Sequence, residues 1–398
     1  MNKAKAIPFP TIRSAIILLW TLFFTSSCKD LFNTPRSIYD RGKVLYEKNQ
    51  YPEALVLFRQ AADEGNTDAM NQIGWMYRRG EGLTTDYEAA MVWFHKAMRN
   101  GNAAAMDNIG WMYHQGYGVK EDDQLAVQWY RRAEGAGSKI AIYNLGWMYE
   151  YGKGVARDYD KAMEYYRRSA QAQNADALNR LGSMYEQGEG VGIDYKKAME
   201  YYLKSANLGC ACAMNNVGWL YSKGHGCVLN DTLAVEWYTK AAKGGYDGAM
   251  NNMGWMYQHG LGVPKDYAKA MQWYQKSART NYDAALNNLG WFYEKGLGVE
   301  IDYQQAMQWY QKAAAFGNGP AMDNIGWMYR NGEGVAKDLH SAMEWYNKSA
   351  NTGDLDAMAD IATLYEKGLG VKKDLKMAED WRRKASEADR SVDSIATK

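Results

Sequence analysis

The chain of 398 residues is poor in cysteine and carries almost no net charge. Its four cysteines are too few for a disulfide-stabilised scaffold. The formal net charge is +1, and acidic and basic residues are interspersed along the chain. Nucleic-acid binding needs a basic face that displaces counterions from phosphates. We therefore expect no nucleic-acid partner.

The sequence also lacks the patterns of common catalytic and cofactor sites. No glycine-rich phosphate loop opens a helix after a strand, and no Ser/His/Asp arrangement is suggested. The histidines form no repeated pair; they are His95, His114, His225, His259 and His340. We expect a protein that is not an enzyme, with no catalytic residue, no cofactor and no metal site.

The first residues differ in composition from the rest of the chain. Basic residues up to Arg13 precede an apolar run, Ala15 to Phe24, which is too short to span a bilayer comfortably. Small residues and Cys28 follow, and the segment resembles a bacterial lipoprotein signal, although Thr25 departs from the usual aliphatic residue. The resemblance implies that residues 1–28 are a signal peptide and that a lipid on Cys28 anchors the exported chain to a membrane of the cell envelope, on its periplasmic or surface side. The alternatives are an ordinary secretory signal or an uncleaved anchor.

A 36-residue period organises the remainder of the chain. A period of this size indicates stacked supersecondary units that share one core. We assign residues 29–36 to a polar tether, 37–65 to a tetratricopeptide-like N-terminal capping unit, 66–389 to nine repeats and 390–398 to a polar tail. One glycine marks the period, at Gly74, Gly110, Gly146, Gly182, Gly218, Gly254, Gly290 and Gly326, and Ala362 takes its place in the ninth repeat.

Each repeat reads as two helices. Met70, Ile73 and Gly74 lie on one apolar face of a first helix. A glycine in mid-helix costs about 1 kcal/mol relative to alanine, so we expect an aromatic side chain of the neighbouring helix to pack there. Gly80 suits the end of the first helix, and Asp86 suits the start of the second. The equivalents of Asp86 are Asp122, Asp158, Asp194, Asn230, Asp266, Asp302, Asp338 and Asp374.

The segment LGWMYEYGKGVARDYDKAMEYYRRSA, residues 145–170, resembles the Sel-one-like repeat (SLR), a relative of the tetratricopeptide repeat. The resemblance covers residues 66–389. It implies an all-α fold, a right-handed superhelical solenoid of antiparallel helix pairs, in which the first helices line a concave groove. It also implies a general role as a scaffold for protein–protein contacts.

Two residue types recur on the first helices at positions that the resemblance places in the groove. One tryptophan follows the period-marking glycine, and one asparagine lies three residues before that tryptophan. The asparagine and the tryptophan are therefore neighbours on the helix surface. The fourth repeat departs from the pattern with Arg180 and Ser183. The candidate ligand-binding residues are Trp75, Asn108, Trp111, Asn144, Trp147, Asn216, Trp219, Asn252, Trp255, Asn288, Trp291, Asn324 and Trp327.

This pattern allows three interpretations. Asparagine amides can bind the backbone of an extended peptide, and indole faces give rigid contact area. A protein or peptide partner is therefore the favoured hypothesis, and a glycan stacked on the tryptophans is the alternative. The third interpretation is structural, because the asparagines could instead bond across adjacent first helices. A second series of tryptophans, one per second helix and including Trp93 and Trp129, is expected to pack between repeats.

Three cysteines lie close together in the sequence of the fifth repeat. Cys210, Cys212, His225 and Cys227 superficially suggest a metal set. Cys212 and His225, however, lie near opposite ends of one helix, roughly 20 Å apart at 1.5 Å per residue. That separation excludes a shared zinc ion, and it excludes a disulfide between Cys212 and Cys227. We expect free thiols.

Overall fold

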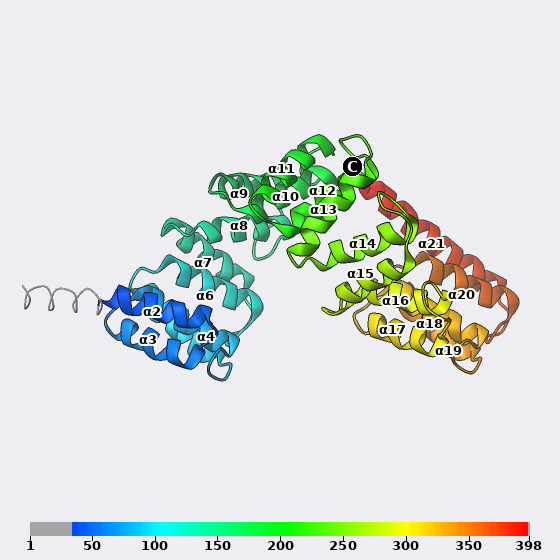
Figure 1. Ribbon diagram of the computed structural model, residues 1–398, viewed down its shortest axis with the longest axis horizontal. Coiled ribbons are helices and arrows are strands. Elements are labelled where there is room, and N and C mark those ends of the chain that lie inside the picture. The colour runs from blue at the N-terminus through cyan, green and yellow to red at the C-terminus, as the bar shows by residue number, and fades with distance from the viewer. Residues whose placement is uncertain (1–33, 397–398) are drawn as a thin grey trace, which may run out of the picture. The chain divides into compact units, whose positions relative to one another are not determined.

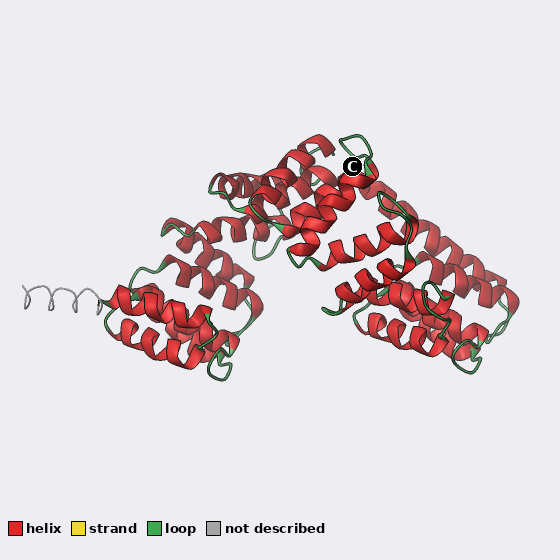
Figure 2. Ribbon diagram, viewed as in Figure 1, coloured by secondary structure: helices red, strands yellow, loops and turns green. Residues whose placement is uncertain are grey.

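The structure is a computed structural model that describes residues 34–396, with side chains up to Asp389. The described chain consists of helices and loops and contains no strand (Figure 2). The predicted signal peptide, Cys28 and most of the tether lie outside the described residues. None of the helices between residues 34 and 396 combines the length and the apolar character needed to cross a membrane.

The described chain forms twenty helices, α2 to α21, arranged as repeated helix pairs. This is the all-α solenoid architecture that the sequence predicts. The pairs are α2 (Pro35–Glu47) and α3 (Tyr51–Asp63), α4 (Thr67–Arg79) and α5 (Tyr87–Arg99), α6 (Ala103–Gln115) and α7 (Asp123–Gly135), α8 (Lys139–Tyr151) and α9 (Tyr159–Gln171), α10 (Ala175–Gln187) and α11 (Tyr195–Asn207), α12 (Ala211–Lys223) and α13 (Asp231–Lys243), α14 (Asp247–His259) and α15 (Tyr267–Ala278), α16 (Asp283–Lys295) and α17 (Tyr303–Ala315), α18 (Gly319–Asn331) and α19 (Leu339–Ala350), and α20 (Leu355–Lys367) and α21 (Leu375–Ala396).

The chain divides into two compact units, Met1–Ser169 and Ala170–Lys398. Figure 1 labels the helices along the chain. In the first unit α4 packs against α5, α5 packs against α6, and the first helices α6 and α8 touch directly. The second unit repeats this pattern, for example with α18 against α19, α19 against α20, and α18 against α20. Adjacent repeats within a unit therefore share one core.

The period-marking glycine faces an aromatic ring of the second helix of its own repeat. A Cβ atom added to Gly74 would lie 2.5 Å from the Phe94 ring, and one added to Gly110 would lie 2.8 Å from the Tyr130 ring. The expected close packing of an aromatic side chain is confirmed. In the last pair Arg382 replaces the ring and Ala362 replaces the glycine.

The loop inside each pair is fixed at both ends. Gly80 ends α4 in the left-handed conformation, with φ +70°, as its position in the sequence predicts. Asp86 caps α5, because its Oδ1 accepts the N–H of Ala89 at 2.9 Å. All nine predicted caps accept such a bond from the first turn of their helices.

The core consists of the apolar faces of the helices. Met70, Ile73 and Met76 of α4 pack with Phe94 and Ala97 of α5, and each of these residues is at most 3% exposed. Full burial of a large apolar side chain contributes about 1.5–3 kcal/mol. Because similar residues continue into the next pair, this core stabilises a row of repeats.

Two helices extend past the expected ends of the repeat array. Helix α2 begins at Pro35, inside the predicted tether, because Thr34 caps it and Pro35 fits its first turn. Helix α21 continues through the expected polar tail as far as Ala396. The loop of the first pair is shorter than that of the next, since residues 48–50 join α2 to α3 whereas residues 80–86 join α4 to α5.

Candidate functional site

The seven candidate tryptophans lie on the first helices, and we call this surface, with the asparagines beside them, the Trp/Asn wall of each unit. Trp75, Trp111 and Trp147 belong to the first unit, on α4, α6 and α8. The second unit contributes Trp219, Trp255, Trp291 and Trp327, on α12, α14, α16 and α18. All seven are half-buried except Trp255, which is 40% exposed. The indoles are therefore neither sealed in the core nor fully open to solvent.

The six candidate asparagines join first helices of adjacent repeats. Each donates an Nδ2 hydrogen bond to a side-chain oxygen one position earlier in the equivalent helix of the preceding repeat. These bonds show the structural role that the sequence left open, but each uses only one of the two amide N–H groups. The bonds join Asn108 to Asn71 (2.8 Å), Asn144 to Asp107 (2.9 Å), Asn216 to Asn179 (3.0 Å), Asn252 to Asn215 (2.9 Å), Asn288 to Asn251 (2.9 Å) and Asn324 to Asn287 (3.0 Å).

The acceptor position is an aspartate in two repeats. Asp107 accepts the amide of Asn144, and burial raises the pKa of its carboxyl group to about 7. Asp323 occupies the same position of a later repeat, but there Asp360 replaces the donor asparagine. Burial, followed by the nearby charges of Asp360 and other aspartates, raises the pKa of Asp323 to about 7. These two carboxyl groups are therefore partly protonated near neutral pH.

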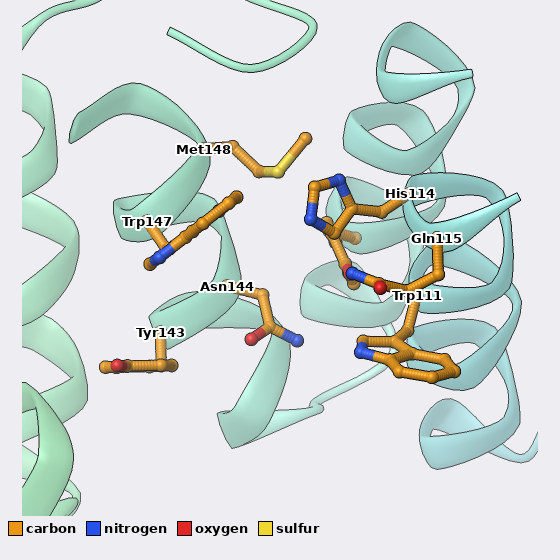
Figure 3. Close-up of a pocket in the computed structure, with 8 residues that line it drawn as sticks. Trp111, His114, Gln115, Tyr143, Asn144, Trp147 and Met148 are labelled. Carbon is orange, nitrogen blue, oxygen red and sulfur yellow. The ribbon is translucent and has the colours of Figure 1, made fainter. Parts of the chain in front are cut away.

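Pockets open between successive tryptophans of the wall. A pocket of 260 Å³ lies between Trp111 and Trp147 and is also lined by His114 and Asn144 (Figure 3). In Figure 3 the Asn144 side chain extends from α8 into the space between these two indoles. A second pocket, of 360 Å³, shares Trp111 and Asn144 and extends to Trp75. Candidate residues from neighbouring repeats thus come together in shared pockets.

The second unit has a comparable pocket of 210 Å³. Trp219, Asn252 and Trp255 line it, together with Lys223 and Tyr238. The fourth repeat, where Arg180 and Ser183 depart from the pattern, begins this unit's wall. Ser183 is 7% exposed, so a small side chain is accommodated where other repeats carry the indole.

Each of these pockets is also lined by the residue three positions after a wall tryptophan, namely His114, Arg78 and Ser222. In several repeats a second-helix tyrosine donates a hydrogen bond to this residue, sixteen positions earlier: Tyr166 to Glu150 (2.5 Å), Tyr202 to Glu186, Tyr274 to Gln258 (2.7 Å) and Tyr310 to Glu294 (2.6 Å). Burial is the main cause that raises the pKa of Glu186. The recurring spacing of sixteen residues was the signal available in the sequence.

His114 occupies this position in the second repeat and is held by an acidic partner. Its Nδ1 atom lies 2.5 Å from Oδ1 of Asp123, and its ring meets Trp147 edge-on with centroids 5.0 Å apart. Tyr130 and Tyr143 line this pocket beside the histidine, and its lining contains no serine, threonine or cysteine. The pair therefore orients His114 as a polar part of the pocket wall.

The tryptophans of the second helices form a different surface. Each is half-buried and covered by the cation three positions later, for example Lys240 at 4.0 Å from Trp237 and Arg132 at 4.7 Å from Trp129. Such cation–π contacts contribute roughly 0.5–1 kcal/mol at exposed sites. The sequence places these residues three apart, a spacing that already indicates the contact.

The cysteines differ from the expectation of free thiols. Cys210 and Cys212 form a disulfide with a Cα–Cα distance of 5.5 Å, because the extended backbone of Cys210 at the start of α12 brings the two side chains together. Cys227 is free. A carboxylate oxygen of Asp176 lies within 4.8 Å of both sulfur atoms. Metal binding, however, requires thiolates, which a disulfide does not supply.

Known proteins show the same repeat. A model of the Sel1 repeat family matches ten segments, at residues 37–66, 67–102, 103–138, 139–174, 175–210, 213–246, 248–282, 283–318, 319–354 and 355–389. The segment from 37 to 66, which the sequence suggested as a capping unit, is thus matched as a repeat as well. A comparison with curated proteins finds no match.

Two solved structures are similar over long stretches. A Sel1 repeat protein from Oxalobacter formigenes is 34% identical, with 63% of this chain and all of that chain covered and a TM-score of 0.57. The protective antigen c5321 of uropathogenic Escherichia coli, described as displaying an SLR fold, is 30% identical, with 92% of this chain and 89% of that chain covered and a TM-score of 0.46. The immunity protein Pa5087 from Pseudomonas aeruginosa is 19% identical over 56% of this chain and 84% of its own, with a TM-score of 0.41.

Proposed function

The chain belongs to the Sel1 repeat family, and we propose that its Trp/Asn wall binds an extended segment of a partner protein without catalysing a reaction. The observation that carries this proposal is the series of pockets between successive tryptophans, each lined by wall asparagines. A wall built on packed helices is ordered before the partner arrives. A flexible segment therefore binds without an additional ordering cost in the wall.

The asparagines keep binding capacity after joining the repeats. An amide offers two N–H donors and one carbonyl acceptor. Asn144 uses one donor on Asp107, and among the residues that the structure describes no protein group donates to its Oδ1 atom. Asn144 also lines both pockets of the first unit. Its second N–H group and its carbonyl oxygen match the backbone C=O and N–H of an extended peptide.

The glycan alternative requires flat indole faces that are open to solvent, and several wall indoles do not offer them. Arg78 covers Trp75, with Cζ 3.6 Å from the ring centroid. The ring of Tyr151 lies 4.8 Å from that of Trp147. His259 packs on Trp255 at 4.5 Å, although Trp255 is the most exposed indole of the series. These contacts favour a peptide over a sugar ring.

The chain itself supplies conservative variants for a test. We expect the double substitution Trp111→Ser and Trp147→Ser to leave the helices folded, because Ser183 occupies the same position in the fourth repeat. A photo-crosslinking residue at Gln115, an exposed part of the Trp111 pocket, should capture a partner in intact cells. The amount of partner captured should be at least about tenfold lower for the double variant, which corresponds to about 1.4 kcal/mol of binding free energy.

The control substitution is Trp129→Tyr on a second helix, since Tyr165 and Tyr201 stand at that position in later repeats. Its capture should equal that of the unchanged chain. Equal capture by the double variant, with helicity intact by circular dichroism, would remove the wall from the binding site.

The location of this binding is the second part of the proposal. The lipoprotein-like signal supports an exported chain that is anchored to the cell envelope by a lipid on Cys28. Metabolic labelling with a radioactive fatty acid should mark the unchanged chain and leave the Cys28→Ser variant unlabelled. Equal labelling of both chains, or of neither, would contradict the anchor.

A further inference from the structure

One guanidinium group of the wall lies over two indole rings. Arg78 projects from α4, and its Cζ atom lies 3.6 Å from the ring centroid of Trp75 and 4.1 Å from that of Trp111. The three side chains line the 360 Å³ pocket of the first unit together with Asp107 and Asn144. Arg78 is therefore part of a built pocket and not a mobile surface residue.

The local sequence explains why Arg78 adopts this position. In other repeats the equivalent residue accepts a bond from a second-helix tyrosine, as Glu294 does from Tyr310. The first repeat carries Phe94 in place of that tyrosine, and phenylalanine has no hydroxyl group. Arg78 cannot be held in the same way, and the two indole faces hold it instead.

The guanidinium lacks an acidic partner within the described chain. Arg78 is half-buried, yet its guanidinium group makes no hydrogen bond and no ion pair with any residue that the structure describes. The carboxylate whose charge acts on it, Glu81, is already bound by Arg79 at 3.2 Å and by the Tyr46 hydroxyl at 2.5 Å. Burial, and then the charge of Arg79, lower the pKa of Arg78.

A second arginine in the equivalent position shows the contrast. Arg330 lies seven repeats later, and its Nη1 atom donates to Oδ1 of Asp360 at 2.8 Å. Its charge is therefore satisfied inside the protein. Arg78 has a comparable place in its repeat but keeps its N–H groups available.

We propose that Arg78 is the anion-recognition point of the wall and binds a carboxylate of the partner segment. This inference rests on the proposed function. The guanidinium N–H groups make no hydrogen bond within the described chain, so they are left for a ligand. The planar edge of a guanidinium matches the two oxygens of a carboxylate with two parallel hydrogen bonds.

The pocket favours a carboxylate over a phosphate. Arg78 is the single cation among its lining residues, and Asp107 lines the same space. With Asp107 protonated, one guanidinium balances a monoanion, whereas a phosphate dianion leaves excess negative charge in the pocket. An acidic side chain and a free C-terminus both supply the required group.

Peptide pools on a solid support test the inference with the detergent-solubilised full chain. The pools are random hexapeptides that share a C-terminal amide and differ in one fixed central residue, which is glutamate, glutamine or lysine. The unchanged chain should bind the glutamate pool at least about fivefold more strongly than the glutamine pool. The preference should shrink in 0.5 M salt, because exposed charges are screened. A glutamine pool with free C-termini identifies the source: binding like the glutamate pool assigns the carboxylate to the C-terminus.

Substitutions at Arg78 provide the specific readout. Arg78→Gln should abolish the preference, and Arg78→Glu should reverse it toward the lysine pool. Gln258 and Glu294 occupy the equivalent position in other repeats, so both variants have precedents in the same fold. Arg330→Gln is the matched control and should keep the glutamate preference.

The outcomes separate this inference from the proposed function. If no pool binds, or if the Trp111→Ser and Trp147→Ser variant binds equally well, the wall is not a peptide site. If binding depends on Trp111 and Trp147 but shows no glutamate preference, Arg78 is not an anion-recognition point. A preference that survives in Arg78→Gln has the same meaning, and in both cases the peptide site itself stands.

Discussion

The Trp/Asn walls of the two units share one scaffold but differ in their polar groups. In the first unit two adjoining pockets are lined by Arg78, Asp107 and His114, and one hydrogen bond donated by a wall asparagine ends on a carboxylate. In the second unit the four hydrogen bonds donated by wall asparagines all end on other asparagines, and the wall pocket contains Lys223 as its cation. Identical backbone geometry therefore leaves the chemistry of each stretch to a few side chains.

The comparison teaches where a partner is recognised. The asparagine-to-asparagine hydrogen bonds of the second unit are the same in each repeat. They hold the repeats together but do not distinguish one partner sequence from another. Charged groups in the first unit occur once each and line pockets. Selectivity for one partner should depend on the residues that break the repetition, because a regular series of asparagines presents the same groups in every repeat.

Substitutions of Asp107 and Asp323 give the largest expected effects on stability. Each has a pKa of about 7 when folded, above the ordinary value of 3.8. The folded chain therefore holds these protons more tightly than the unfolded chain between about pH 4 and 7. Stability from this source is present at low pH and is lost as the pH rises through 7. At 1.36 kcal/mol per unit the shift corresponds to at most about 4 kcal/mol for each group.

Asp107→Asn and Asp323→Asn should each raise the free energy of unfolding at pH 8 by about 1–3 kcal/mol and leave it nearly unchanged at pH 4. Denaturant unfolding at both pH values measures this. The comparison becomes sharper in salt. Part of the shift at Asp323 comes from nearby acids, whereas burial alone raises the pKa of Asp107. Salt should therefore reduce the increase in the free energy of unfolding caused by Asp323→Asn and leave the increase caused by Asp107→Asn unchanged. Flat pH profiles for the unchanged chain would contradict both expectations.

The glycines test whether the scaffold is the same in both units. An added Cβ would lie 2.8 Å from the Tyr130 ring at Gly110 and 2.5 Å from the Tyr310 ring at Gly290. Each alanine substitution should destabilise its unit by about 1–3 kcal/mol, because overpacking outweighs the gain in helix propensity.

The matched control is Gly135→Ala at the end of α7, where an added Cβ meets no atom within 4 Å. This variant should gain up to about 1 kcal/mol. Thermal unfolding of the three variants gives the sign of each effect. Equal behaviour of Gly110→Ala and Gly135→Ala would show that the ring contact does not constrain the first helices.

The repetition in the sequence made much of the scaffold predictable. Helix pairs, caps at Asp86 and its equivalents, and the ring against each Gly74-type glycine follow from local rules that act within one repeat. Boundaries at the two ends of the array were less certain. The Pro35 start of α2 and the extension of α21 to Ala396 depend on single residues without a repeated copy for comparison.

The candidate site was predictable in part. The position of the asparagines and tryptophans on one helix face follows from their spacing. Their hydrogen-bond partners were not predictable, because the acceptor of Asn144, Asp107, lies 37 residues away in another repeat. The disulfide between Cys210 and Cys212 depends in a similar way on the backbone turn that begins α12.

The sequence by itself determined the period, the helix pairs and the face that carries the indoles and amides, because each of these depends on residues within one turn or one repeat. Only the tertiary structure decided which amides are occupied, which carboxyl groups are buried and which cation has no acidic partner among the described residues. Those properties arise where side chains of adjacent repeats meet. Arg78 is the clearest case, since its neighbour Trp111 belongs to the next repeat and the missing hydroxyl of Phe94 to the other helix of its own.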